Sequence, residues 1–441
     1  MIIKLKNLSK NDNFLKYFKN SSWMIFEYIL RVFSVIFVGI YVARYLGPEN
    51  FGILSYALAI TSIFLAFSRF GMENIIVRDI AKNFQDQKKI MATGFSIIVL
   101  ATLCSWIILL FWIVIFEENK QTQLLLFVIS TSLIFQTFLI IDYNFQAQVK
   151  AKYSSIAKSI ALAINSIIKI VLVIKDADLI YFAISYVLDH LILSILLISL
   201  HLKYNQPNFL FSIEKKLFLP LLKSALPITF SILATFLFMR TDQLMIQNMM
   251  NSFDLGLYSA AIKIYEGWIL MPIVLSLSLL PAIVSLKKEN PDKYQSRLVL
   301  LFKSVFIASV IVALLALPLA DLFITITYGP AYLESGKVLS ILLWAAVFTG
   351  IWTISAKYMI VEKLEHKVFT HTFFGLILNI LLNYLLIPVY GINGAAISTL
   401  ITMFIISIIL NLFDSKLYNL NTIIFEAMYI SSVFKTRKLN D

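Results

Sequence analysis

Cysteine and histidine are scarce in this sequence, and their scarcity excludes several kinds of chemistry. The single cysteine, Cys104, lies inside an apolar run, so the chain has neither an internal disulfide nor a cysteine metal cluster. The four histidines lack metal-ligand spacing, and the closest pair, His366 and His371, are five residues apart. No Walker A, GxSxG, HExxH or CxxC pattern occurs. We therefore predict that the protein is not an enzyme and needs no cofactor.

Charged residues are also few. They make up 14% of the 441 residues, whereas soluble globular domains contain about 25%. Hydrophobic residues make up 60%, and the mean hydropathy is +0.85. Apolar runs of roughly 20 residues recur along the chain, and such a run is long enough for a helix to cross the hydrocarbon core of a bilayer. The composition therefore predicts an all-α integral membrane protein.

The apolar runs predict about twelve membrane-spanning helices joined by short connections. The predicted spans cover residues 23–44, 52–70, 92–116, 122–141, 156–173, 180–200, 224–239, 255–281, 298–319, 338–360, 369–389 and 394–413. Lysine and arginine gather in alternate connections, and each connection on the opposite side carries at most one of them. By the positive-inside rule, both termini are predicted to be cytoplasmic. This distribution explains the net charge of +12 without nucleic-acid binding.

The two halves of the chain carry a weak internal repeat. Residues 52–61 read GILSYALAIT and residues 256–265 read GLYSAAIKIY, with four identities at an offset of 204. Repeated halves are common in transporters. We predict a cytoplasmic N-terminal segment at 1–22, a six-helix bundle at 23–200, a cytoplasmic linker at 201–223, a second six-helix bundle at 224–413 and a cytoplasmic tail at 414–441.

Two shorter stretches receive specific predictions. In residues 46–52, LGPENFG, glycine and proline predict a tight turn, after which a second helix begins at Ile53 and a basic, polar segment with Arg78 and Lys82 follows. Residues 423–434 are moderately apolar, and we interpret them as an interfacial helix or a loose tail instead of a thirteenth span.

Charged residues inside the apolar runs are the candidate functional residues, because a charge at mid-bilayer costs about 2.5–3.5 kcal/mol. Glu27 and Arg31 are one helical turn apart in the first span, and Lys263 and Glu266 are one turn apart in the eighth, so each pair is able to form an ion pair. Further candidates are Arg69 at the cytoplasmic end of the second span, Asp189 in the sixth, and Arg240 with Asp242 at the outer end of the seventh.

Two interpretations of these charges stay open. In the first, the pairs neutralise themselves so that the helices insert, and Arg69 anchors a helix at the cytoplasmic membrane surface. In the second, the charges line a cavity that suits an anionic headgroup such as a diphosphate. The substrate-binding candidates are then Arg31, Arg69, Lys263 and Arg240. The candidates for ion coupling or charge pairing are Glu27, Asp189, Glu266 and Asp242.

Several stretches resemble one known group of membrane proteins. LGPENFGILSYA followed by FGMENIIVRDIAK, then YGPAYLESGKVLSILLWA (328–345) and LILNILLNYLLIPVYGINGAAISTLIT (376–402), are similar to the polysaccharide-transporter branch of the multidrug/oligosaccharidyl-lipid/polysaccharide exporter superfamily. Within that branch the chain most resembles Wzx-type O-antigen flippases. The resemblance covers essentially the whole chain, but it does not identify one glycan.

The resemblance implies a fold and a function. Two six-helix bundles would be related by a pseudo-twofold axis along the membrane normal and would form a V around a central cavity. The substrate would be an undecaprenyl-diphosphate-linked oligosaccharide, moved from the cytoplasmic to the periplasmic leaflet of the bacterial inner membrane. Polysaccharide polymerase and chain-length proteins are the protein partners to expect. Family cations on the first, second and eighth helices match Arg31, Arg69 and Lys263, although the cation of the eighth helix is a lysine here, and the arginine of the first is paired with a glutamate.

Two other functions are compatible with twelve spans. A cation-coupled drug or metabolite exporter of the same superfamily shares the topology, and efflux of cationic dyes would favour it. A membrane glycan polymerase or ligase belongs to another class, but such enzymes resemble one another in having a sizeable outer loop, and the outer connections of this chain are tiny.

Overall fold

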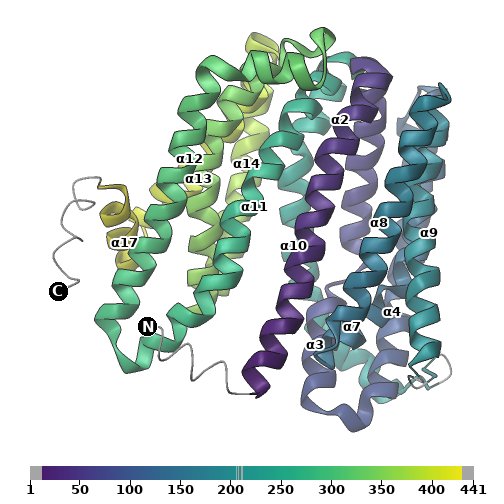
Figure 1. The fold of residues 1–441 in the computed structure, drawn as a ribbon, viewed down its shortest axis with the longest axis vertical. Coiled ribbons are helices and arrows are strands. Elements are labelled where there is room, and N and C mark those ends of the chain that lie inside the picture. Colours follow the sequence, from purple (N-terminus) through teal and green to yellow (C-terminus); the bar gives the residue numbers. More distant parts are fainter. Residues whose placement is uncertain (1–11, 205, 207, 210–211, 430–441) are drawn as a thin grey trace. The chain divides into compact units, whose positions relative to one another are not determined.

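The fold is seen in a computed structural model that describes residues 12–204, 206, 208–209 and 212–429, and in these residues all regular elements are helical (Figure 1). The helices of the first half are α2 (Asp12–Ser68), α3 (Met72–Lys82), α4 (Gln87–Phe116), α5 (Lys120–Ser130), α6 (Ser132–Gln136), α7 (Ile140–Ala147), α8 (Ala151–Ile174) and α9 (Leu179–Lys203). Those of the second half are α10 (Lys215–Met249), α11 (Ser252–Glu289), α12 (Pro291–Thr327), α13 (Ser335–Val361), α14 (Glu365–Tyr390), α15 (Ile392–Phe404), α16 (Leu410–Leu412) and α17 (Tyr418–Met428). Short 3₁₀ turns and one π-helical turn, Ile405–Ile409, join some of them.

Eleven helical segments of the described chain are long and apolar enough to cross a membrane. The first, Ser22–Lys82, contains the non-helical residue Gly47 and therefore holds two of the predicted spans. Each of the other ten predicted spans matches one of the remaining segments, although the spans 255–281 and 394–413 extend one residue past Leu280 and Leu412. The prediction of an all-α, multi-span membrane protein is confirmed.

The turn between the first two spans is tighter than the sequence predicted. Gly47 has φ 71° and ψ 168°, and the second helix resumes at Pro48 instead of Ile53. The positive φ favours glycine, while proline at the start of a helix has the required φ and lacks only an N–H that would have no helical partner. Gly52, which we expected in the turn, lies inside the second helix, so the turn does not explain why glycine occupies this position.

Contacts between residues divide the chain into two compact units. Unit 1 comprises Met1–Leu46 and Ile53–Phe236, and unit 2 comprises Gly47–Gly52 and Leu237–Asp441. The helix α10 contributes residues to both units. The boundaries predicted at 200 and 224 for the two bundles stay a prediction.

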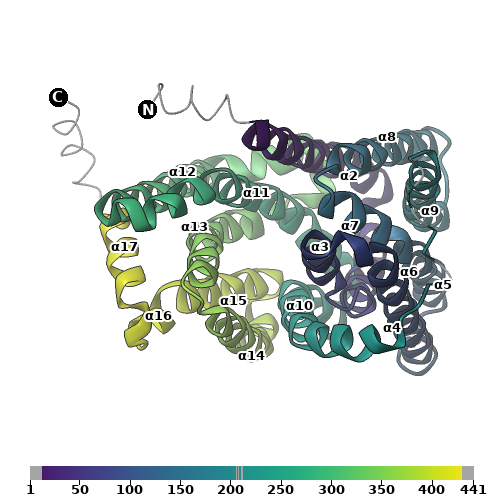
Figure 2. The ribbon, with the colours of Figure 1, turned by 90° about the horizontal axis from the view of Figure 1, so that it is seen from below.

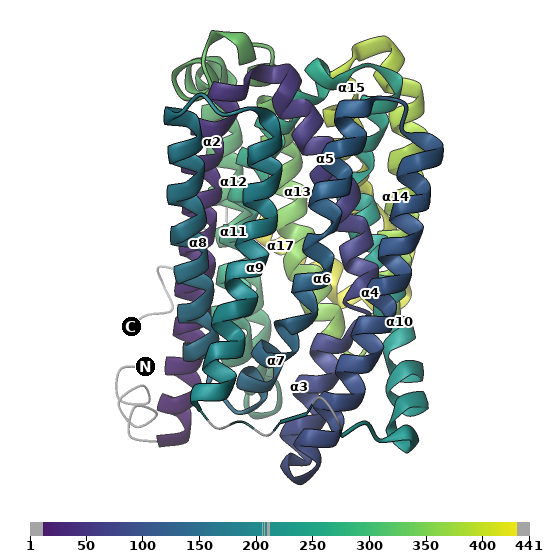
Figure 3. The same cartoon turned by 90° about the vertical axis from the view of Figure 1, so that its right-hand side faces the viewer.

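In unit 1, the segment after the second span forms part of the core. The apolar residues Met72, Ile75, Ile76 and Ile80 lie on one face of α3 and are at most 1% exposed, while the basic residues lie on the exposed face. This face packs against α7 and α4. The segment predicted to be basic and polar is therefore an amphipathic helix with a buried face. Figure 3 shows α8 and α9 running side by side in the same unit.

In unit 2, α13 is the central helix. It packs against α11, α12 and α15, and Figure 2 shows it among these helices end-on. The short helix α17 lies against α12 through Leu420, Ile423, Ile424 and Ala427. Its 11 residues are too few to span a bilayer, and its interfacial position stays a prediction. Residues 430–434 of that prediction lie outside the described chain.

The two repeated glycines meet in unit 2. A Cβ atom at Gly52 would lie 1.7 Å from the carbonyl oxygen of Ser252, and a Cβ at Gly256 would lie 1.8 Å from that of Pro48. In each case the blocking carbonyl belongs to the residue four positions before the other glycine. The repeat therefore marks a reciprocal helix crossing in which the two backbones touch, as small residues allow between membrane helices.

Candidate functional site

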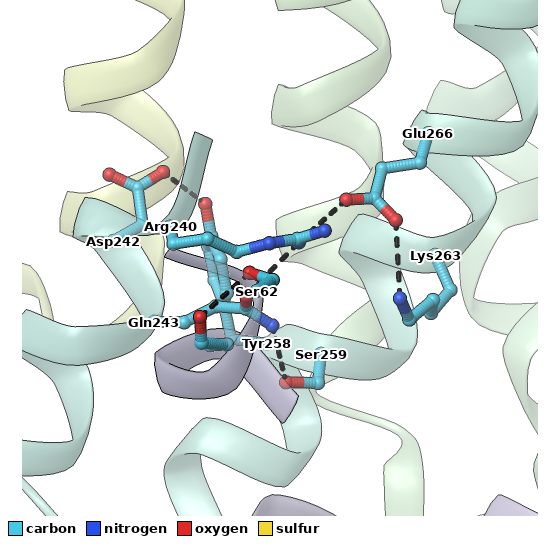
Figure 4. Close-up of polar contacts among 9 residues, drawn as sticks. Ser62, Arg240, Asp242, Gln243, Tyr258, Ser259, Lys263 and Glu266 are labelled. Atoms are coloured by element: carbon cyan, nitrogen blue, oxygen red, sulfur yellow. Dashed lines mark hydrogen bonds and ion pairs between the residues drawn. The ribbon is translucent and has the colours of Figure 1, made fainter. Parts of the chain in front are cut away.

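Two cations share one carboxylate inside unit 2 (Figure 4). Arg240 Nη1 lies 2.8 Å from Glu266 Oε1, and Lys263 Nζ lies 3.2 Å from Glu266 Oε2. The side chains of Arg240, Glu266 and Lys263 are only 17%, 23% and 30% exposed. This cationic triad carries a net charge of +1. The predicted pairing of Lys263 with Glu266 is confirmed, whereas the participation of Arg240 was missed.

Neighbouring amide and hydroxyl groups hold the arginine in place. Arg240 Nη1 also donates to Gln243 Oε1 at 3.2 Å, and Gln243 Nε2 donates to Ser259 Oγ at 3.2 Å. Arg240 Nε is buried and has no hydrogen-bond partner. The guanidinium is therefore fixed by its acceptors and keeps one N–H donor unpaired, which is the kind of group that binds an anionic oxygen.

The sequence misplaced the end of the seventh span. We predicted that it ends at residue 239, with Arg240 and Asp242 at the outer membrane surface, but α10 continues to Met249 and Asn251 caps the next helix. The helix continues because its polar residues find partners within unit 2. Glu266 of α11 pairs with Arg240. Four side chains from α11, α14 and α15 surround Asp242, namely Tyr258, Asn379, Asn383 and Thr399.

Asp242 sits in a second polar cluster, which involves α14 and α15 in addition to the two helices of the triad. Its carboxylate accepts hydrogen bonds from Tyr258 Oη at 2.5 Å, Asn383 Nδ2 at 2.7 Å and Thr399 Oγ1 at 2.5 Å. Asp242 is 7% exposed, and the donors come from α11, α14 and α15. Asn379 adds an amide oxygen that accepts from Asn383 at 3.2 Å.

This Asp242 cluster supplies neutral donors to a buried acid, and none of these three hydrogen bonds comes from a cation. Carboxylate, amide and hydroxyl oxygens in such a place are able to hold either a proton or a hard cation. Sequence reasoning found Asp242 but missed its partners. Asn379 and Asn383, one turn apart in an apolar run, were the available signal.

Unit 1 contains the other predicted charges. Arg31 donates from Nε and Nη2 to Glu27 Oε1, each at 2.9 Å, so the predicted pair is confirmed. Glu27 is 8% exposed, whereas the side chain of Arg31 is 36% exposed. Asp189 lies within electrostatic range of Lys169 and Arg31. The Asn165 side-chain amide, oriented to match its neighbours, bridges Lys169 Nζ at 3.2 Å and the Ser185 carbonyl at 2.9 Å.

Arg69 lies at the break between α2 and α3, and its surroundings differ from those of a surface anchor. Its Nη2 donates to Gln136 Oε1 of α6 at 2.8 Å, and its Nε is buried without a partner. The chain continues beyond it into the buried face of α3. The helix α2 ends at Ser68, which agrees with the predicted place of Arg69 at the end of the second span, while the cytoplasmic side stays a prediction. The side chain of Arg69 contacts an internal amide that the sequence did not single out.

The structure thus groups the predicted residues unevenly. Arg240, Lys263 and Glu266 form one cluster, and Asp242 belongs to another in the same unit. In unit 1, Glu27 pairs with Arg31, and Arg69 with Gln136, while Asp189 lies near Lys169. The roles of these residues stay predictions.

Three curated proteins show sequence similarity to the chain. An uncharacterised membrane protein of Methanocaldococcus jannaschii is 29% identical over 42% of this chain and 43% of its own length. The "Probable flippase AglR" of Haloferax volcanii is 30% identical over 35% of this chain and 33% of its length. The chain therefore matches less than half of these two relatives. The "Putative O-antigen transporter" of Shigella flexneri is 23% identical over 86% of this chain and 93% of its length.

Solved structures share the fold. The lipid II flippase MurJ in an inward closed conformation superposes with a TM-score of 0.72 at 16% identity, covering 96% of this chain and 94% of its own. An inward-facing multidrug transporter of the MATE family gives a TM-score of 0.70 at 14% identity, covering 92% and 96%. At these identities the likeness concerns the fold alone.

A family model places the chain among known sequences. The model described as "Polysaccharide biosynthesis protein" matches residues 18–287, which is more than half of the chain. This match agrees with the multi-span helical fold and with the relatives above. The chain belongs to the polysaccharide biosynthesis protein family.

Proposed function

We propose that the protein is a flippase for an undecaprenyl-diphosphate-linked oligosaccharide, which it moves from the cytoplasmic to the outer leaflet of the bacterial inner membrane. The product would serve O-antigen or related surface polysaccharide synthesis. The observation that carries this proposal is the cationic triad, because it places a net positive charge and an unpaired guanidinium N–H inside a membrane helix unit of a polysaccharide-family transporter. The names of two relatives, a flippase and an O-antigen transporter, support the same substrate class.

The physical task defines what such a protein supplies. A sugar headgroup does not cross hydrocarbon unaided, because each hydroxyl would lose its hydrogen bonds to water. Interior polar groups replace those bonds, and cations such as Arg31, Lys263 and Arg240 offset the diphosphate charge. The polyprenyl tail stays in lipid during the transfer. Alternating exposure of the site to the two sides, by movement of one helix bundle against the other, completes the cycle.

The motifs of the sequence limit the energy sources that the protein is able to use. It has no Walker A motif, so we propose coupling to an ion gradient or to the membrane potential. The candidate coupling groups are Glu27, Asp189, Glu266 and Asp242. Asp242 is the strongest of them, because the three side chains that donate to it are neutral, while Glu266 and Glu27 already pair with cations.

Complementation tests the proposal in cells. The chain is expressed in a bacterium that lacks its own O-unit flippase, and surface polysaccharide is measured together with the amount of protein in the membrane. We expect restoration by the native chain and its loss in the Arg31→Ala, Lys263→Ala double variant at equal protein level. Restoration that survives the double variant would keep the function and reject these two cations as substrate contacts.

The orientation is tested separately. Reporter fusions at residue 429 and in the connection after Phe116 measure which side of the membrane each position occupies. We propose that the first lies in the cytoplasm and the second outside, as the lysine and arginine distribution indicates. The opposite pattern would reverse the proposed direction of transport.

A further inference from the structure

Four buried polar atoms without hydrogen-bond partners occur around Arg69 in unit 1. They are Arg69 Nε, Gln136 Nε2, Ser132 Oγ and His190 Nε2. Ser132 and Gln136 are 0% and 5% exposed. Because buried polar groups are normally hydrogen-bonded, several unpaired ones in one region mark a place where a ligand or water completes the bonds.

Contacts between helices bring these residues together. Gln136 Oε1 accepts from Arg69 Nη2 at 2.8 Å, which fixes the amide and directs its two N–H groups elsewhere. Ser132 lies one turn before Gln136 on the same face of α6. Ser194 Oγ donates to the carbonyls of Phe135 at 2.6 Å and His190 at 2.8 Å, so the turn of α9 that carries His190 lies beside the end of α6.

The charge around this group favours an anion. Arg69, Arg31 and Lys169 all lie within electrostatic range of the His190 ring. The nearby carboxylates are Asp189, next to His190 in α9, and Glu27, which already accepts from Arg31. Asp142, which pairs with Lys158 Nζ at 2.6 Å, and the exposed Glu73 lie within electrostatic range of Tyr143, as Arg69 does. Arg69 Nε and Gln136 Nε2 are donors only, and Ser132 Oγ is able to donate. Unpaired donors beside a guanidinium are the groups that bind a phosphate or carboxylate.

We propose that Arg69, Gln136, Ser132 and His190 form an oxyanion-binding subsite in unit 1, which holds a charged oxygen group of the transported molecule. This inference rests on the proposed function. Two groups of a lipid-linked oligosaccharide have the required chemistry, namely the diphosphate and the carboxylate of an acidic sugar. In either case Gln136 acts as a donor to the substrate, and Arg69 both holds Gln136 and contributes charge.

The Gln136→Glu substitution separates this role from a structural one. Glutamate keeps an oxygen for Arg69 Nη2 but replaces the free N–H₂ by a second oxygen, which repels an anion. The matched control is Gln87→Glu. Gln87 is also 5% exposed in unit 1, but its Nε2 is paired with Asn144 Oδ1 at 2.7 Å.

Calorimetric titration of the purified full-length chain in detergent measures saturable binding of inorganic pyrophosphate in one arm and glucuronate in the other. Thermal unfolding of each variant is recorded in parallel. We expect the native chain to bind at least one of these probes, at least tenfold weaker binding in Gln136→Glu with undiminished thermal stability, and binding within twofold of native in Gln87→Glu. The arm that responds identifies the group that is held.

Native-like pyrophosphate and glucuronate binding in Gln136→Glu, or binding of neither probe by the native chain, would overturn the subsite. A stable Ser132→Ala variant gives a second check, with weaker binding expected and unchanged binding counting against the proposal. The outcome is independent of complementation. Binding by a chain that fails to restore surface polysaccharide would support the subsite and reject the proposed function.

Discussion

Glu266 accepts hydrogen bonds from two cations, and this arrangement makes it sensitive to substitution. The Glu266→Gln variant leaves Arg240 and Lys263 without a counter-charge in a part-buried place. We expect a loss of about 1–3 kcal/mol in stability, less than for fully buried pairs because all three side chains retain some exposure. Thermal unfolding of purified protein measures the loss. Glu426→Gln on the exposed face of α17 is the control, and an equal effect at both positions would contradict the assigned pairing.

Asp242 is the residue through which ion coupling is tested. In Asp242→Asn, one carboxylate oxygen becomes an amide donor. It then faces either Asn383, which donates to Oδ1, or Tyr258 and Thr399, which donate to Oδ2. We expect a stability loss of about 1–3 kcal/mol. We also expect transport to lose its dependence on a proton or sodium gradient. Asp292→Asn, at the exposed start of α12, should keep that dependence, and a gradient response that persists in Asp242→Asn would remove Asp242 from the coupling groups.

A pH effect is expected where α14 meets the end of the last span. The Lys367 ammonium donates to Asp414 Oδ2 at 2.5 Å and holds the pKa of that carboxyl below its usual range. Because the folded pKa is depressed, the pair stabilises the fold above the unfolded pKa of about 3.9, and the stabilisation disappears as pH falls through the folded pKa. We expect a contribution of about 0.2–1 kcal/mol, typical of partly exposed pairs.

Thermal unfolding between pH 7 and pH 3 measures the Lys367–Asp414 contribution. The native chain should lose its advantage over Asp414→Asn as the pH falls below 4. A constant difference between the two proteins across this range would show that the ion pair does not stabilise the fold.

At the scale of helices, the crossing of Gly52 and Gly256 gives the sharpest prediction. In Gly256→Ala, the new methyl group would lie 1.8 Å from the Pro48 carbonyl oxygen, so the two helices must separate. We expect a loss of about 1–3 kcal/mol or more, as for other overpacked sites. Gly39→Ala is the matched control, because nothing lies within 4 Å of its added Cβ. Equal thermal stability of the two variants would contradict the contact.

Sequence patterns predicted the helices and the local ion pairs but not the contacts between helices. Apolar runs located every span, and the spacing of Glu27 with Arg31 and of Lys263 with Glu266 predicted bonds that the structure confirms. Arg240 and Glu266 are 26 positions apart on different helices, so no local period relates them. The end of α10 was predicted too early for the same reason. Polar residues after position 239 are typical of a loop, and the sequence does not show that their partners lie on distant helices.

At the scale of the whole molecule, the fold is that of a multi-span helical membrane protein and the family is that of polysaccharide biosynthesis proteins, whereas the proposed transport depends on the interior charges. The repeat around Gly52 and Gly256 links the two halves of the sequence to a reciprocal contact. Charged clusters occur in both units, with Arg31 and Arg69 in unit 1 and Arg240 and Lys263 in unit 2. Substrate contact through both sets is the central claim.

The most direct test of that claim is a leaflet assay with purified components. The chain is reconstituted into vesicles that contain an undecaprenyl-diphosphate-linked oligosaccharide, and a membrane-impermeant reagent measures the fraction of glycan on the outside over time. We predict that the native chain makes the inner pool accessible and that the Arg31→Ala, Lys263→Ala variant does so at least tenfold more slowly. An accessible fraction that stays at the level of protein-free vesicles would contradict the proposed function.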